Sequence, residues 1–197
     1  MSILASGEVR HIELNHGYYA TVDARDFDWL SEWEWKIDGS GYAVRYYSEV
    51  DESSRKRTER ALMHREIFEH YGNRLGNLEI DHRDRQKLNN VYSNLRLATR
   101  TQNRANSSRR SDNKSGVTGV CYNKKTRKWQ AHITLNNKTL YLGSFSEKVD
   151  AIAVRKQAIL QHFGEYANTS DDLTPCPRIL KEIKRTDFYV WDPPKNT

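Results

Sequence analysis

The sequence predicts an α+β protein made of two modules, with a β-rich segment at the start of the first module. Three features of the 197 residues support this fold class. Short alternating stretches, typical of strands, are followed by stretches with helical spacing. Residues 107–116 hold no apolar side chain and separate two such series. All four prolines lie after residue 174, which sets the end of the chain apart.

These breaks define the expected domains. We predict a first domain over residues 1–106, a basic linker over 107–115, a second domain over 116–168 and a C-terminal tail over 169–197. No apolar run approaches the roughly 18 residues of a membrane span. The N-terminal residues lack the pattern of a secretory signal, and two cysteines are too few for a disulfide scaffold.

The first 72 residues predict a β-rich scaffold with two short helices. Residues 8–22 alternate around an Asn-His-Gly turn and predict a β-hairpin. Residues 24–33 predict a short helix, and residues 33–47 predict two strands around an Asp-Gly-Ser-Gly turn. The charged residues 51–60 show no periodicity and are expected to form a loop. Residues 60–72 predict a helix that ends at a glycine.

The scaffold carries aromatic residues and one histidine that need an interpretation. We expect Tyr18, Tyr19, Trp33 and Trp35 to lie in the core rather than to stack on bases. His64 lies on the predicted helix, where a buried or hydrogen-bonding role is expected.

Residues 78–108 hold the chemically informative pattern. A strand is predicted to end at Asp81-His82, a second strand covers residues 94–99, and Thr99 can cap a helix from about Arg100 to Ser107. Two strands and a helix would bring Asp81 and His82 close to the first helical turns.

This grouping suits phosphodiester hydrolysis. A water molecule must lose a proton near neutral pH, and histidine is the side chain adapted to accept it. A hard divalent cation can stabilise the charge that develops on the phosphate, and it prefers oxygen ligands such as those of Asp81 and a helix-borne asparagine.

The segment resembles the HNH nuclease family, whose ββα-metal core would cover about residues 78–106. The matching pattern is Asp81-His82, then Asn94 in Asn-Leu-Arg and Asn103 in Thr-Gln-Asn. The resemblance implies that His82 is the general base, that Asp81 and Asn103 are metal ligands, and that Asn94 ties down the loop carrying His82. Asn90 is the alternative choice for the middle position. The zinc-binding cysteine pairs of some members are absent from the sequence, so no structural zinc is expected.

The charge distribution indicates where a polyanion would bind. Residues 1–60 have a net charge of −4, residues 61–115 and 116–168 each have +5, and residues 169–197 are neutral. Basic residues around the motif are candidate phosphate contacts, and those of the linker are suited to a minor groove. These candidates are Arg83, Arg85, Lys87, Arg100, Arg104, Arg109, Arg110 and Lys114.

The second domain predicts three strands and a helix. Strands are expected over residues 116–123, 128–137 and 138–145, and a helix over 146–164 that Ser146 caps. This segment resembles the AP2 DNA-binding domain through Gly119-Val120, Lys128 to Ile133, Tyr141 to Phe145 and the helix that follows. By period-2 alternation, one sheet face would present Lys128, Gln130, His132 and Thr134 to DNA, together with Thr139 and Tyr141.

Together, the two resemblances imply a site-specific DNA endonuclease of the homing type that nicks or cuts double-stranded DNA. One Mg2+ or Mn2+ is expected in each active site. We expect a monomer or homodimer, with no membrane association, in the cytoplasm of a bacterial or phage-infected cell. Two alternatives remain: a DNA-binding regulator with a vestigial HNH fold, and a restriction-type nuclease with a short palindromic site.

Overall fold

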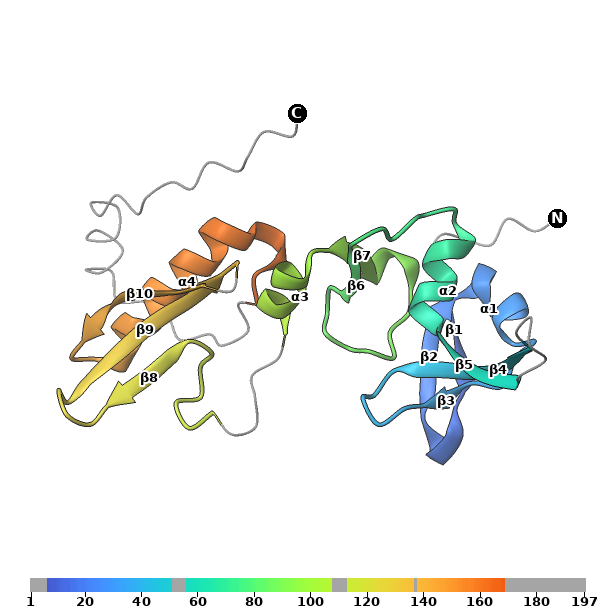
Figure 1. Cartoon of the computed structure of the whole chain (residues 1–197), viewed down its shortest axis with the longest axis horizontal. Helices are drawn as coiled ribbons and strands as arrows, with labels where there is room; N and C mark the ends of the chain where they lie inside the picture. The colour runs from blue at the N-terminus through green and yellow to red at the C-terminus, as the bar shows by residue number, and fades with distance from the viewer. Residues whose placement is uncertain (1–6, 51–55, 108–112, 137, 169–197) are drawn as a thin grey trace. The chain divides into compact units, whose positions relative to one another are not determined.

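The computed structural model describes residues 7–50, 56–107, 113–136 and 138–168, and the chain divides into two compact units, Met1–Asn106 and Ser107–Thr197 (Figure 1). Each unit combines small antiparallel sheets with helices, so the prediction of a mixed α+β protein is confirmed. No helix in the described part of the chain is long and apolar enough to cross a membrane.

The first unit begins with a hairpin of β1 (Val9–Glu13) and β2 (Tyr19–Asp23), as predicted. The turn between them uses left-handed backbone at His16 (φ 60°) and Gly17 (φ 73°), which suits glycine at the second position. Helix α1 (Ala24–Leu30) follows, again as predicted.

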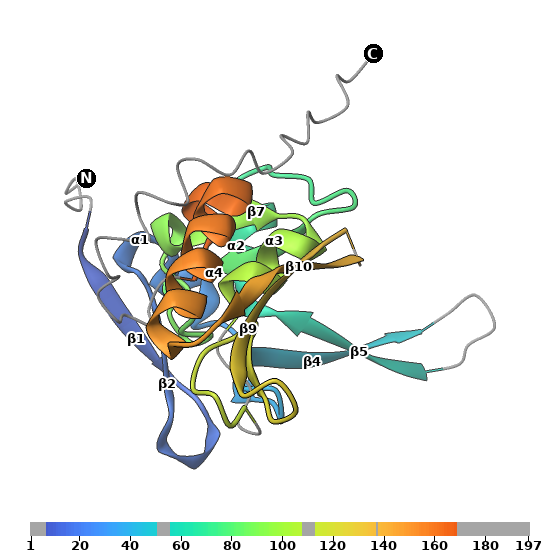
Figure 2. The ribbon, with the colours of Figure 1, turned by 90° about the vertical axis from the view of Figure 1, so that its left-hand side faces the viewer.

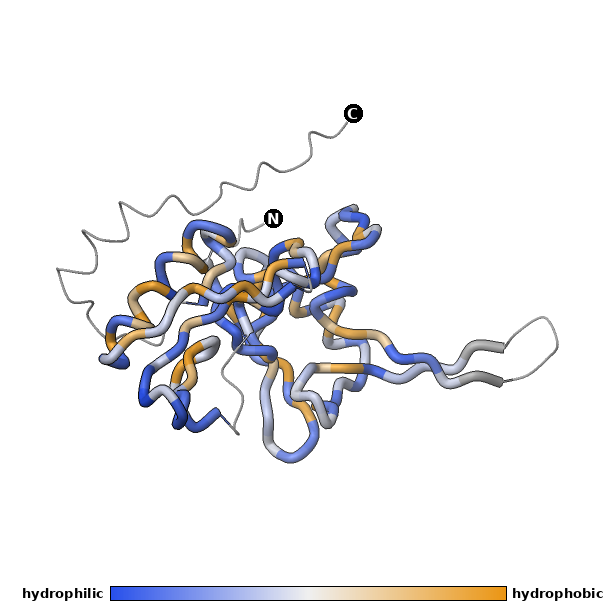
Figure 3. Tube along the Cα trace, turned by 60° about the vertical axis from the view of Figure 1, so that its left-hand side comes forward, coloured by the Kyte–Doolittle hydropathy of each residue, from blue (hydrophilic) through white to orange (hydrophobic). Residues whose placement is uncertain are grey.

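A three-stranded sheet comes next, built from β3 (Lys36–Ile37), β4 (Ala43–Val50) and β5 (Lys56–Leu62). The expectation of a loop over residues 51–60 is wrong for residues 56–60, which belong to β5; residues 51–55 lie outside the described part. β5 pairs with β4 along its whole length, and the two strands extend away from the rest of the unit (Figure 2). Residues 56–60 hold no apolar side chain, and the coloured part of this ribbon turns from hydrophobic at its base toward hydrophilic farther out (Figure 3). β5 therefore lacks the apolar alternation by which strands are predicted.

Helix α2 (Met63–His70) follows β5 directly and supplies the centre of the core. Trp35, Leu30, Met63 and Ile67 are almost fully buried, and the Trp35 indole donates a 2.8 Å hydrogen bond to the Leu30 carbonyl oxygen. The expectation that Trp33 and Trp35 are core residues is therefore confirmed, since Trp33 packs against this cluster.

The same expectation is wrong for the two tyrosines of the first hairpin. Tyr18 and Tyr19 are 50% and 53% exposed. Tyr19 begins β2 and pairs with Glu13, and its neighbour Ala20 takes the buried side of the strand. Because successive side chains of a strand point to opposite faces, burial of Ala20 directs Tyr19 outward.

The last part of the first unit is a hairpin and a helix. Strands β6 (Glu79–His82) and β7 (Leu95–Ala98) pair antiparallel, and α3 (Arg100–Asn106) packs beside them. The Gln102 amide donates a 3.2 Å hydrogen bond to the Thr99 hydroxyl oxygen, and the Thr99 amide donates a 2.8 Å bond to the Gln102 side chain. This reciprocal cap confirms the predicted start of the helix.

The second unit holds a sheet of strand order β10-β9-β8 with one helix against it. The strands are β8 (Val120–Asn123), β9 (Lys128–Leu135) and β10 (Lys138–Phe145), and the helix is α4 (Lys148–Phe163). Ala131 and Ile133 of β9 are buried with Ala151 and Ile152 of α4. Lys128, Gln130, His132 and Thr134 alternate with these buried residues and lie on the other face, as the period-2 pattern predicts.

Of the two predictions for the ends of α4, one is confirmed and the other is wrong. Gly164 stops the helix at φ 50°, as expected. Ser146 does not cap it, because α4 starts one residue later than that role requires, with Glu147 at the cap position and no side-chain capping bond.

Candidate active site

His82 is the last residue of β6 and is buried. Its Nε2 lies 3.3 Å from the Oδ1 of Asn90, a fully buried side chain. The Asn90 amide nitrogen donates a 3.2 Å bond to the Leu88 carbonyl oxygen, which leaves the amide oxygen to face His82. The His82 Nε2 therefore carries the proton that Asn90 accepts, and Nδ1 keeps the lone pair.

Backbone contacts fix the position of Asn90. Its amide donates a 2.7 Å bond to the Thr21 carbonyl oxygen, and the Thr21 amide donates a 2.8 Å bond to the Leu88 carbonyl oxygen. The loop between β6 and β7 is thereby fastened to β2, far away in the sequence. Because both its backbone amide and its side-chain amide are hydrogen-bonded, Asn90 is held in one position. Its side chain can therefore set the orientation of the His82 ring.

Asn94 has a different position in this loop. Its side chain accepts a 3.1 Å bond from the Asp84 amide, and donates bonds to the Asp84 carboxylate at 2.9 Å and to the Asn89 carbonyl oxygen at 2.8 Å. These contacts shape the loop between the strands. Asn90, the alternative choice for the middle position, is the residue within hydrogen-bonding distance of His82.

The environment of His82 favours its neutral form. Burial lowers the pKa of His82 below its usual value of 6.5, and this outweighs the hydrogen bond to Asn90 and the nearby Asp84 and Asp81 carboxylates, which act in the opposite direction. A neutral imidazole at physiological pH can accept a proton from water.

Asp81 lies buried on β6 and is held from two sides. Arg96 of β7 places its Nε and Nη2 each 2.8 Å from the Asp81 Oδ2. Asn106 at the end of α3 donates from Nδ2 to the Asp81 Oδ1 at 2.9 Å and to the His82 carbonyl oxygen at 2.8 Å. The carboxylate is therefore fixed before any ligand binds.

The structure places Asn103 next to Glu79 rather than in contact with Asp81. The Asn103 Nδ2 donates a 2.7 Å bond to the Glu79 carboxylate. Glu79 and Asp81 lie on one face of β6, and Asn103 and Asn106 are one turn apart on α3. Each carboxylate of the strand therefore accepts a hydrogen bond from one asparagine of the helix. Sequence reasoning missed Glu79, Arg96 and Asn106; the i, i+3 spacing of the two asparagines was the available signal.

These residues fit a hard divalent cation by their chemistry. Asp81 and Glu79 supply carboxylate oxygens, and Asn103 has an amide oxygen left because its nitrogen bonds Glu79. Oxygen donors of this kind suit Mg2+ or Mn2+. Among the described residues, no group of three or more His, Cys, Asp or Glu side chains is gathered for a metal ion.

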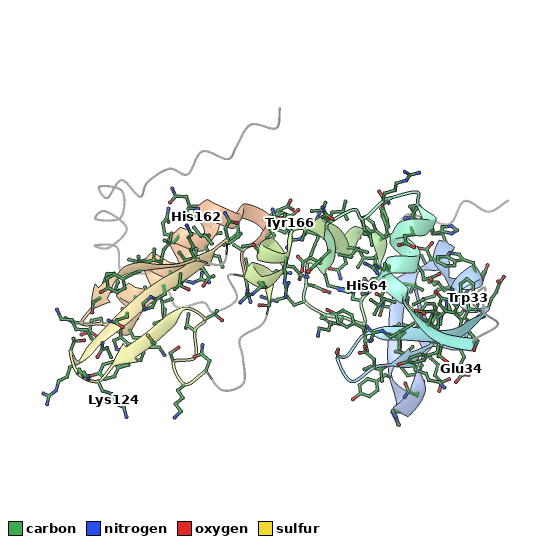
Figure 4. All side chains as sticks on the ribbon, in the orientation of Figure 1. Trp33, Glu34, His64, Lys124, His162 and Tyr166 are labelled. Carbon is green, nitrogen blue, oxygen red and sulfur yellow. The ribbon has the colours of Figure 1, made fainter. Side chains whose placement is uncertain are left out.

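Two rings from outside the strand-strand-helix core pack around His82. His64 at the start of α2 has its ring centroid 5.1 Å from that of His82, and Tyr42, just before β4, lies 5.2 Å from His64 and 6.0 Å from His82 (Figure 4 labels His64). The expected burial of His64 is confirmed, but its Nδ1 is buried with no hydrogen-bond partner in the described chain. Burial, with His82 and Arg65 nearby, lowers the pKa of His64 to about 3.

Lys87, a predicted phosphate contact, is exposed and bonds another part of the first unit. Its ammonium donates a 2.8 Å bond to the Ser40 carbonyl oxygen and lies 4.5 Å from the centroid of the Tyr42 ring. It thus connects the turn before β4 to the loop after His82. Arg83, Arg100 and Arg104 are exposed near α3 and the site, whereas Arg85 is half-buried. Arg109 and Arg110 lie outside the described residues.

In the second unit, the predicted contact residues share the sheet face opposite α4. Thr134 and Thr139 pair across β9 and β10 with hydroxyl oxygens 3.1 Å apart, and the rings of His132 and Tyr141 lie 5.5 Å apart. Lys128 and Gln130 continue this face along β9, and Lys114 is exposed at the start of the unit. We call the six residues of β9 and β10 the polar sheet face: Lys128, Gln130, His132, Thr134, Thr139 and Tyr141.

A strand pair with an Asp-His end, joined to a helix that carries asparagines, defines a nuclease-type centre. The family model described as HNH endonuclease matches residues 61–105. An uncharacterized HNH endonuclease, L560, from Acanthamoeba polyphaga mimivirus is 30% identical over 153 residues, covering 77% of this chain and 74% of the relative. The chain therefore belongs to the HNH endonuclease family. No solved structure matches it.

Proposed function

We propose that this protein is a metal-dependent DNA endonuclease in which His82 is the general base. The observation that carries the proposal is the hydrogen bond between the His82 Nε2 and Asn90, because it leaves Nδ1 as the proton acceptor. The lowered pKa of His82 keeps that acceptor neutral at the pH of a cell.

We assign the metal-binding role to Asp81 and Asn103, with Glu79 beside them. When bound, Mg2+ or Mn2+ would stabilise the negative charge that builds up on the phosphate and on the leaving oxygen. Arg96 and Asn106 hold the Asp81 carboxylate in place, and Glu79 turns the Asn103 amide so that its oxygen is available. Asn94 maintains the loop that carries His82 and Asn90.

Hydrolysis by this centre has a definite product. Water, losing its proton to His82, attacks the phosphorus, and the 3′-oxygen leaves, so the cut strand ends in a 5′-phosphate. One centre per chain gives a nick from a monomer, and a homodimer is required to cut both strands in one encounter.

The second unit is assigned to DNA recognition by its resemblance to AP2 domains. Its polar sheet face combines a cation, an amide and hydroxyl groups, which are suited to phosphates and base edges in the major groove. A nuclease centre joined to a separate recognition unit favours a long target of the homing type over a short palindrome.

The decisive experiment uses supercoiled plasmid carrying a candidate target, incubated with Mg2+ or Mn2+. Wild type should convert it to the nicked form, and His82→Ala should lose about 100- to 10,000-fold in rate, the usual contribution of a general base. His11→Ala, which removes an exposed histidine, is the matched control and should nick normally.

Equal absence of nicking in wild type and His82→Ala, with DNA binding retained, would instead identify a regulator with a vestigial nuclease fold. Cleavage mapping on random-sequence DNA separates the two nuclease alternatives. A short palindromic site would contradict the homing assignment.

A further inference from the structure

Tyr42 lies outside the segment matched by the family model, yet its side chain belongs to the candidate active site. The residue sits in the turn between β3 and β4. Its ring faces both histidines of the site, 5.2 Å from His64 and 6.0 Å from His82 between centroids. The β-rich segment therefore forms one wall of the centre and is more than a scaffold.

The turn that carries Tyr42 is held rigidly. The Asp38 Oδ1 accepts bonds from the amides of Ser40 at 2.8 Å and of Tyr42 at 2.9 Å, while its Oδ2 accepts a 3.0 Å bond from Arg60. Lys87 donates to the Ser40 carbonyl oxygen at 2.8 Å from the loop after His82. The position of Tyr42 relative to His82 is thus set from both sides.

The hydroxyl group of Tyr42 is not bonded to another side chain. Within the described residues no hydrogen bond holds it, and the side chain is partly exposed, so the hydroxyl can exchange a water molecule for a phosphate oxygen. Burial raises the pKa of Tyr42 above its usual value of 10, and the Asp38, Asp81 and Glu79 carboxylates act in the same direction. The hydroxyl therefore keeps its proton at every pH at which the enzyme would work.

We propose that Tyr42 is a catalytic residue of the nuclease centre, whose hydroxyl donates a hydrogen bond to a non-bridging oxygen of the scissile phosphate. The inference rests on the proposed function. A phosphodiester bound between His82 and the Asp81 side supplies the anionic acceptor that the hydroxyl lacks. Because that oxygen gains charge in the transition state, the bond strengthens as the reaction proceeds.

The test removes one tyrosine hydroxyl group at a time. Tyr42→Phe keeps the ring against His64 and His82 and the ammonium of Lys87 over its face, and removes only the hydroxyl. Tyr46→Phe, on β4 just after that turn and 55% exposed, is the matched control. Single-turnover nicking of supercoiled plasmid with Mn2+ is measured at saturating protein, at a temperature where circular dichroism shows all variants folded.

We expect Tyr42→Phe to nick about 10- to 100-fold more slowly, the effect of losing one hydrogen bond to a charged group, with unchanged affinity for the plasmid. Tyr46→Phe should match wild type. A wild-type rate for Tyr42→Phe, or weaker binding with an unchanged saturated rate, would overturn the inference and leave the nuclease assignment intact. Absence of nicking by wild type itself would overturn both.

Discussion

The candidate active site and the polar sheet face differ in how their polar groups are held. Around β6, Asp81 contacts both Arg96 and Asn106, and His82 contacts Asn90, all of them buried. The polar sheet face has cross-strand pairs between side chains that are exposed or half-exposed. Buried, mutually bonded groups keep one geometry, which catalysis requires, whereas exposed groups can adjust to a groove.

The largest effect is expected where the buried network loses a charge. Asp81→Asn removes the carboxylate charge that two nitrogens of the buried Arg96 guanidinium contact, so the free energy of unfolding should fall by about 3 to 5 kcal/mol, and nicking should be lost with the proposed metal ligand. Urea denaturation and plasmid nicking measure the two effects.

The control for that variant is a surface pair of the same chemistry. Asp28 lies 3.6 Å from Arg10 with both side chains largely exposed, and Asp28→Asn should change the free energy of unfolding by less than about 1 kcal/mol. Similar losses of unfolding free energy in Asp81→Asn and Asp28→Asn would show that the buried Asp81 pair stabilises the protein no more than an exposed pair does.

The next effect separates the two asparagines of the loop. Asn90→Ala removes the partner of His82, so the nicking rate should fall about 100-fold and the acidic limb of the pH-rate profile should move to lower pH, because the lost bond had raised the pKa of His82. Asn94→Ala should lower thermal stability without moving that limb. A shift of the acidic limb in Asn94→Ala, with none in Asn90→Ala, would instead identify Asn94 as the hydrogen-bond partner of His82.

A smaller effect concerns stability in acid. The unfolded chain protonates His64 below pH 6.5, but the folded chain resists protonation down to about 3. Stability from this residue is therefore complete above pH 6.5 and is lost as the pH falls, by about 2 kcal/mol between pH 7 and pH 5.

His64→Phe should remove this part of the acid sensitivity, as measured by urea denaturation at the two pH values. His11→Phe, at an exposed position, should retain the wild-type difference. An unchanged difference in His64→Phe would mean that His64 is protonated in the folded protein.

The smallest effect is expected on the polar sheet face. Lys128→Ala should weaken DNA binding several-fold and reduce the slope of log affinity against log salt by about 1, because one phosphate contact is lost. The nicking rate of bound DNA should not change. A change in that rate, with unaltered salt dependence, would place Lys128 in the catalytic machinery.

Sequence patterns predicted the elements and the Asp81-His82 pair because their signals are local: alternation in β6 and β7, the Thr99 cap, and the spacing to Asn103. They could not predict which side chains meet. The register between α3 and β6 brings Asn106, not Asn103, to Asp81, and a backbone connection to β2 brings Asn90 to His82.

The missed strand has the same physical origin. β5 escaped prediction because an exposed ribbon is stabilised by its ladder with β4 and needs no apolar pattern. For Lys87, charge predicts a phosphate contact but cannot show that a backbone oxygen from the β3–β4 turn is also within its reach. Both features depend on contacts between residues distant in the chain.

The bonds that fasten the loop between β6 and β7 to β2 limit how the first unit can be divided. Bonds between Thr21 and residues Leu88 and Asn90, and a 2.7 Å bond from the Tyr92 amide to the Asp23 carboxylate, take the place that bound zinc fills in other small folds. Residues 61–105, the part that matches the family model, lack those partners. A protein engineer who transplants this HNH unit into a fusion must carry the chain from Val9 onward.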